Sequence, residues 1–128
     1  MVIVNDLSGE KPERKFTFDH ALWSHDRFVN DENGYSRGTD GKYCDQDKVM
    51  KLLGNTVLEK AWKGLNSTLF AYGQTGAGKS YSIFGYGENK GIIPNASIEL
   101  FERIKQDTQG DTSFRVSVQM VEIYMEKI

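Results

Sequence analysis

The chain has 128 residues, of which 38% are hydrophobic and 27% charged. This composition is typical of one soluble globular domain and too apolar for a disordered tail. The formal net charge is −2, from 16 basic and 18 acidic residues, so no general electrostatic field favours nucleic acid or an anionic membrane. No apolar run approaches the length of a membrane span. The single cysteine, Cys44, excludes an internal disulfide and favours a reducing, intracellular setting.

The first part of the chain is expected to form two strands and a surface loop. Met1–Val4 is apolar, Asn5–Glu13 is rich in turn-forming residues, and Lys15–Asp19 alternates polar and apolar residues. This order predicts a β-hairpin. The stretch Asn30–Tyr43 holds three glycines and many charges without a hydrophobic period, which predicts a surface loop.

A helix and then a short strand are expected in the middle of the chain. From Asp45 onward apolar residues recur at steps of three and four, and Gly64 is a plausible stop. The apolar positions are Val49, Leu52, Leu53, Val57, Leu58, Ala61, Trp62 and Leu65. The run Ser67–Tyr72 predicts a strand that ends at Gly73, and Gly78–Phe84 is compatible with a second helix.

The last part of the chain continues the alternation of helices and strands. Gly85–Gly91 is expected to be a loop, and Pro94 suits the start of a helix that ends before Gly110. The apolar face of this helix is predicted to hold Ile98, Phe101 and Ile104. Alternation from Phe114 onward predicts a strand with a bulge, or one buried on both faces. Strands alternating with helices indicate an α/β structure in layers around a central sheet.

The segment Gly73–Ser80 carries the chemistry, because it matches the phosphate-loop pattern of spaced glycines followed by Lys and Ser. The glycines let successive N–H groups converge on a phosphate at the start of a helix, and a side chain at Gly78 would obstruct that approach. Lys79 can reach the bridge between the β- and γ-phosphates, and the Ser80 hydroxyl can ligate Mg²⁺. The alternative is a glycine-rich turn that binds nothing. It is disfavoured because a strand precedes the loop and a helix follows it.

The loop lies within the longer string Phe70–Gly85, which resembles the motor signature of the kinesins. Similar strings occur in the order that the family shows, namely Phe16–His20 with Trp23, Gly91–Pro94, Leu100–Phe101 and Val121–Lys127. The resemblance covers nearly the whole chain apart from Asn30–Tyr43. The segments Trp23–Asp26 and Lys79–Tyr81 most closely resemble those of the vesicle-transporting kinesins that have a forkhead-associated domain after the motor.

The resemblance implies an α/β fold of the phosphate-loop NTPase (kinesin motor) type, with an incomplete central sheet and flanking helices. Residues 1–128 would form part of a motor domain, the phosphate-loop half, without its first strand and both switch regions. The implied cofactors are ATP or ADP and Mg²⁺, and the implied partner is the microtubule (tubulin), bound through the missing part. The implied location is the cytoplasm, at the cytoskeleton. Nothing implies nucleic acid or identifies a cargo.

The site residues implied by the resemblance lie in and just after the loop. Lys79 and Ser80 would be catalytic, Ser80 would be the metal ligand, and Tyr81 would lie against the adenine ring. The nucleotide-binding set is Gly73, Gln74, Thr75, Gly76, Ala77, Gly78, Lys79, Ser80 and Tyr81. Because hydrolysis in kinesins depends on switch residues that orient water and stabilise charge, the isolated chain is expected to be inactive.

Two other functions are compatible with the sequence. The chain could be a non-catalytic nucleotide-binding or regulatory protein. It could also be an unrelated phosphate-loop NTPase or nucleotide kinase, which the kinesin-like strings on both sides of the loop disfavour. Such an enzyme would also need a Mg²⁺-binding Asp at the end of a later strand, and no acidic residue has that setting. His20 and His25 lack ligand neighbours and are assigned no chemistry.

Overall fold

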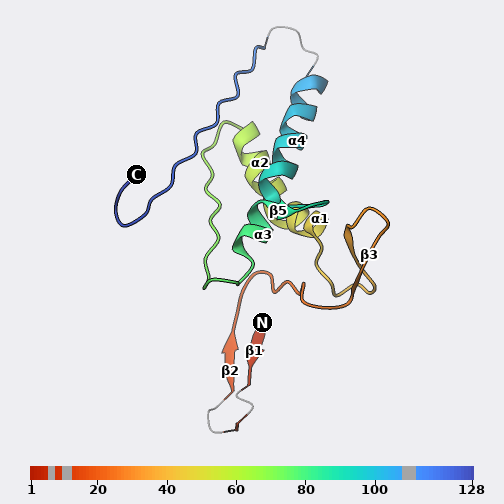
Figure 1. Cartoon of the computed structure of the whole chain (residues 1–128). Coiled ribbons are helices and arrows are strands. Elements are labelled where there is room, and N and C mark those ends of the chain that lie inside the picture. The colour runs from red at the N-terminus through yellow and green to blue at the C-terminus, as the bar shows by residue number, and fades with distance from the viewer. Residues whose placement is uncertain (6–7, 10–12, 108–111) are drawn as a thin grey trace.

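The computed structural model describes residues 1–5, 8–9, 13–107 and 112–128 (Figure 1). Its elements are β1 (Val2–Val4), β2 (Arg14–Phe16), β3 (Phe28–Asn30), β4 (Ser36–Gly38), α1 (Gln46–Val49), the π-helical segment η1 (Met50–Gly54), α2 (Asn55–Trp62), α3 (Lys79–Ile83), β5 (Gly85–Tyr86), β6 (Asn89–Lys90) and α4 (Ile92–Gln106). Within the described ranges the strands pair only as antiparallel hairpins, β1 with β2, β3 with β4, and β5 with β6. The helices lie together in the middle of the molecule (Figure 1).

The predicted helix after Asp45 is confirmed as α1, η1 and α2, which follow one another without a break. The Asp45 carboxylate caps its start by accepting a hydrogen bond from the N–H of Lys48 at 2.9 Å. The helix ends at Trp62 with Lys63 as its C-cap, and Gly64 follows with a φ of 74°, as expected for a glycine after a helix. Both ends therefore follow from local residues.

Helix α4 packs across η1 and α2, and this contact holds most of the core. The buried apolar side chains there are Met50, Leu58 and Ile92. Arg103 of α4 adds an ion pair with Glu59 of α2 at 2.6 Å. Among the described residues the helices are too short or too polar to cross a membrane.

The predicted bounds of α4 are close, but two of the three residues of its predicted apolar face are exposed. Ile98 and Phe101 are 47% and 50% exposed, although Ile104 is half-buried. The packed side instead starts at Ile92, which is buried against η1 near Gly54. Pro94 lies in the first turn, where its missing N–H costs nothing. Gly110, before which the helix was predicted to end, lies outside the described residues.

The N-terminal hairpin is confirmed, with Val2 opposite Phe16 and Val4 opposite Arg14. Its second strand ends at Phe16 rather than at Asp19. Within the predicted turn Asn5–Glu13, residues 6–7 and 10–12 lie outside the described part of the chain.

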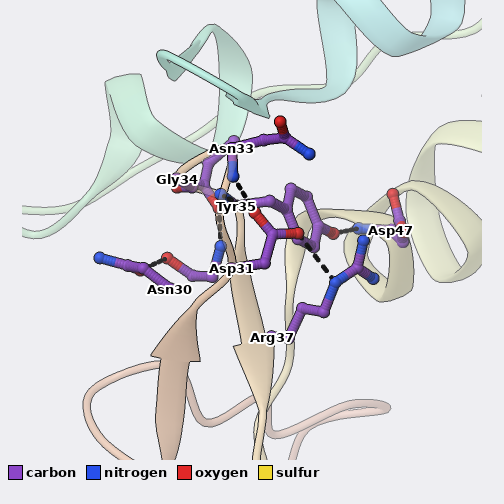
Figure 2. A network of polar contacts seen from close by, with 9 residues as sticks. Asn30, Asp31, Asn33, Gly34, Tyr35, Arg37 and Asp47 are labelled. Atoms are coloured by element: carbon purple, nitrogen blue, oxygen red, sulfur yellow. Dashed lines mark hydrogen bonds and ion pairs between the residues drawn. The ribbon is translucent and has the colours of Figure 1, made fainter.

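The prediction of a surface loop over Asn30–Tyr43 is wrong, because β3 and β4 form a hairpin there. Figure 2 shows the Asp31 carboxylate at its turn, where it accepts hydrogen bonds from the N–H groups of Asn33 and Tyr35, each at 3.0 Å. Its other oxygen accepts from Arg37 Nε at 3.0 Å. These bonds lower the pKa of Asp31 from its ordinary value, and the bond from the Tyr35 N–H contributes most. The Asp31 side chain thus fixes the turn together with the backbone bonds between Asp31, Gly34 and Tyr35. Gly85–Gly91, predicted as a loop, also forms a small hairpin, β5–β6.

The strands predicted at Ser67–Tyr72 and from Phe114 onward are not formed. Both segments run as extended chain without a strand partner in the part of the protein that is described (Figure 1). Tyr72 is 94% and Val118 88% exposed. A strand needs a hydrogen-bonded neighbour, so an apolar pattern without one leaves the segment extended and exposed.

The accessible surface is large for the size of the chain. It measures 11056 Å², whereas a compact monomer of 14.5 kDa exposes about 6,900 Å². Among the described residues the buried hydrophobic side chains are Tyr43, Cys44, Met50, Leu58 and Ile92. The helical part is therefore packed, and the expected central sheet is incomplete.

We predict that the 128-residue chain is marginally stable and self-associates through its exposed C-terminal segment. The double variant Val118→Lys/Ile123→Lys should shift the association to higher protein concentration, because it places two charges on exposed apolar positions. Sedimentation velocity over a concentration series measures this shift.

The control is Ser117→Lys/Gln119→Lys, which adds the same charge to the same segment without removing an apolar side chain. Equal effects of the two double variants would mean that net charge, rather than apolar contact, controls association. A monomeric wild-type chain at high concentration would contradict the prediction.

Candidate phosphate-binding site

The loop Gly73–Ser80 adopts a backbone that only glycine enters readily. Gly76 and Gly78 have φ values of 84° and 86°, where a β-carbon is disfavoured. A Cβ at Gly73 would lie 3.0 Å from the Cβ of Ala77, which is closer than side chains ordinarily pack. At Gly76 and Gly78 a Cβ would meet nothing within 4 Å. The glycines are therefore required by backbone conformation, and open space adjoins the second half of the loop.

Helix α3 starts from this loop with unused amide donors. Its first turn closes with the N–H of Ser82 donating to the carbonyl of Gly78 at 3.0 Å. The N–H groups of Lys79, Ser80 and Tyr81 precede that bond and have no helical acceptor. Gly78 is the N-cap and offers no capping side chain. Because α3 has only five residues, these individual donors matter more than the helix dipole.

The Lys79 side chain folds back across the loop. Its Nζ donates to the carbonyl oxygens of Gly73 at 2.7 Å and Gln74 at 2.8 Å. These two bonds use two of the three ammonium donors, so the third is available to an anion. Lys79 therefore ties the two ends of the loop together and brings a positive charge to it.

The other predicted loop residues are exposed. The side chains of Gln74, Thr75, Ala77 and Ser80 all lie at the surface, and Ser80 is in the first turn of α3. Among the residues described, no group of three or more His, Cys, Asp or Glu side chains could hold a metal ion. The assignment of the Ser80 hydroxyl as a metal ligand stays a prediction.

Tyr81 is half-buried and turned toward the β3–β4 hairpin side of the molecule. Burial is the main cause that raises the pKa of its hydroxyl, with further contributions from Tyr43, and hydrogen bonds with Ser36 and Gln46 oppose the shift. The structure thus brings Tyr81 together with Ser36, Tyr43 and Gln46. Its assignment to an adenine ring stays a prediction.

Two polar residues that contact this region were missed by sequence reasoning. Gln46 is only 3% exposed and donates from Nε2 to the carbonyl of Tyr81 at 2.7 Å. Asn89 bonds the turn after α3 to the β3–β4 hairpin. Neither residue belongs to a motif, and both contacts join positions far apart in the sequence, so no local pattern could indicate them.

Comparisons with known proteins give a single family. The family model for the kinesin motor domain matches residues 2–128. The chain is 44% identical to kinesin-like protein KIF28 of Rattus norvegicus over 129 aligned residues, 99% of this chain and 12% of that protein. It is 43% identical to kinesin-like protein KIF13A of Homo sapiens over 97% of this chain and 6% of that protein. The chain therefore spans a small part of the length of these relatives.

Solved structures agree with the sequence relatives. A KIF14 structure with ADP in complex with a microtubule superposes with a TM-score of 0.71 at 33% identity, covering 85% of this chain and 27% of that one. A KIF14 dimer with AMP-PNP in complex with a microtubule gives a TM-score of 0.70 at 32% identity, with 85% and 26% covered. The expected α/β motor fold is thereby confirmed, whereas the narrower resemblance to kinesins with a forkhead-associated domain stays a prediction. With the family model matched from residue 2 to residue 128, the chain belongs to the kinesin motor domain family.

Proposed function

We propose that this chain is the ATP-binding part of a microtubule-dependent motor protein, and that residues 1–128 form the phosphate-loop half of its motor domain. The observation that carries the proposal is the loop Gly73–Ser80, whose positive-φ glycines lead into α3 beside the Lys79 ammonium. The similarity to KIF14 structures with ADP or AMP-PNP in complex with a microtubule supports it. ATP hydrolysis in the full-length protein would drive movement along microtubules, in the cytoplasm at the cytoskeleton.

The loop can bind phosphate through three kinds of group. The N–H groups of Lys79, Ser80 and Tyr81 donate toward an anion at the start of α3. The Lys79 ammonium, now on two loop carbonyls, exchanges neutral acceptors for charged phosphate oxygens. The Ser80 hydroxyl would supply one ligand to Mg²⁺. When bound, Mg²⁺ neutralises charge on the β- and γ-phosphates.

Hydrolysis needs groups beyond this loop. Within residues 1–128 there is neither a serine-rich first switch nor an Asp-Leu-Ala-Gly-Ser-Glu second switch. No group in these residues is therefore assigned to orient the attacking water or to stabilise the transferred phosphoryl group. Lys79 and Ser80 hold the phosphates and the metal, and the rest of the motor would complete the chemistry and contact tubulin.

We predict that Lys79→Ala weakens Mg²⁺–ATP and Mg²⁺–ADP binding roughly 10- to 100-fold, the loss of one charge-assisted contact. Isothermal titration with each nucleotide measures the dissociation constants. Lys105→Ala, which removes an exposed lysine of α4, is the matched control and should bind as the wild type does. Equal affinity of wild type and Lys79→Ala would remove the loop from the mechanism.

We predict that Gly78→Val abolishes phosphate binding and leaves the helices formed. A new Cβ would meet no protein atom within 4 Å, but valine is strained at a φ of 86°, so the loop must change its path. Circular dichroism should therefore stay close to the wild type while nucleotide titration gives no signal. Retained binding would show that the amides of this loop do not wrap the phosphates.

We predict that the 128-residue chain hydrolyses ATP at only a residual rate and that polymerised tubulin does not stimulate it. Missing water positioning and charge stabilisation remove several factors of ten in rate. Phosphate release is measured with and without microtubules, and a longer protein that contains the switch regions is the positive control. Clear stimulation of the short chain by microtubules would contradict the proposed division of the site. Nucleotide binding without stimulation in the longer protein would favour a non-catalytic role.

A further inference from the structure

A buried glutamine joins the start of α1 to the helix that follows the phosphate loop. Gln46 is 3% exposed, and its Nε2 donates to the carbonyl of Tyr81 at 2.7 Å. The same nitrogen lies 3.5 Å from the carbonyl of Asn89. Tyr81 directly follows Lys79 and Ser80, so the Gln46 side chain is hydrogen-bonded to the first turn of α3.

The Tyr81 carbonyl needs such a partner because α3 is very short. The N–H of Phe84 closes its last turn on the carbonyl of Ser80 at 2.8 Å, and Gly85 then leaves the helix with a φ of 82°. The carbonyl of Tyr81 therefore lies beyond the helical ladder. Since a buried acceptor without a donor is costly, Gln46 acts as the cap of this end of α3.

A second amide bonds the β3–β4 hairpin to the turn after α3. Asn89 Oδ1 accepts from the N–H of Ser36 at 2.8 Å, and its Nδ2 donates to the carbonyl of Gly34 at 3.0 Å. Its side chain thus pairs with the hairpin backbone as a neighbouring strand would. Figure 2 shows the other side of the same turn, where the Tyr35 hydroxyl accepts from the N–H of Asp47 at 3.2 Å. The hairpin is therefore bonded both to α1 and to the segment behind α3.

We propose that Gln46 and Asn89 are positioning residues for the phosphate loop, through which the β3–β4 hairpin holds α3 in the orientation that aims Lys79 and Ser80 at the nucleotide. The inference rests on the proposed nucleotide binding by that loop. Neither side chain contacts phosphate. Each instead fixes the backbone that carries the phosphate-binding groups. Small displacements of that backbone would weaken all of the phosphate contacts at once. The expected consequence of losing either amide is faster release of nucleotide.

The experiment uses the natural full-length protein and the dissociation rate of a fluorescent ADP analogue with Mg²⁺. Gln46→Leu keeps the size of the side chain and removes the donor to Tyr81, and it should speed dissociation roughly tenfold, the worth of one buried hydrogen bond. Asn89→Leu should act in the same direction. Asn89→Asp keeps the acceptor for Ser36 but sets a carboxylate oxygen against the Gly34 carbonyl in place of the donor, so it should also speed dissociation. Gln106→Leu, at the end of α4, is the matched control.

The thermal unfolding midpoint of each nucleotide-free variant separates positioning from mere stability. A purely structural role would lower this midpoint and leave the dissociation rate unchanged at temperatures where the protein is fully folded, and that result would overturn the inference. If Gln46→Leu does not fold, Asn89→Leu decides, and a dissociation rate equal to that of the wild type would overturn the inference.

Lys79→Ala distinguishes failure of the positioning role from failure of nucleotide binding by the loop. If Lys79→Ala loses nucleotide while the Gln46 and Asn89 variants release it at the wild-type rate, only the positioning role falls. If Lys79→Ala binds as the wild type does, the proposed function of the loop falls first, and the positioning role falls with it.

Discussion

The close approach of η1 to the start of α4 is the contact on which the rest of the structure depends. Gly54 is buried there, and a Cβ in its place would overlap the sulfur of Met50 and contact Ile92. The wider π turn, which accommodates an extra residue, ends at this glycine. Because Ile92 follows the β5–β6 hairpin directly, the same packing fixes where α3 and the phosphate loop lie. The small core therefore positions the phosphate loop rather than supporting a sheet.

Elements that depend on neighbouring residues were predictable, and those that depend on distant partners were not. The helix after Asp45 carries its own period, cap and stop, so its bounds followed from the sequence. The segments Ser67–Tyr72 and 114–125 have the composition of strands, but a strand exists only with a partner. The β3–β4 hairpin was missed although Asn33–Gly34 is a dipeptide typical of hairpin turns. The segment is highly charged and has no hydrophobic period, because the Asp31 carboxylate and backbone bonds stabilise the turn rather than apolar burial.

The candidate site divides in the same way. The loop could be predicted because its function requires glycine at fixed places, and Gly76 and Gly78 do adopt the positive φ that this explanation requires. The contacts that hold the loop in place could not. Gln46 reaches Tyr81 across 35 positions, and Asn89 reaches Ser36 across 53. An amide side chain has no periodicity to reveal it, and only the folded backbone shows that an orphan carbonyl lies within its reach.

The two sides of the phosphate loop are anchored unequally, which gives Lys79 two competing duties. After the loop, α3 is held by Gln46, Asn89 and the packing of α4. Before it, the chain has no strand partner among the described residues, and the bonds from Lys79 to Gly73 and Gln74 hold the first half of the loop. When the ammonium turns to a phosphate, it gives up carbonyls that hold the first half of the loop. The entropic cost of ordering that half then reduces the free energy of nucleotide binding, unless strand neighbours for Ser67–Tyr72 hold it in advance. In the chain as it stands, completion of the sheet and affinity for nucleotide are therefore physically coupled.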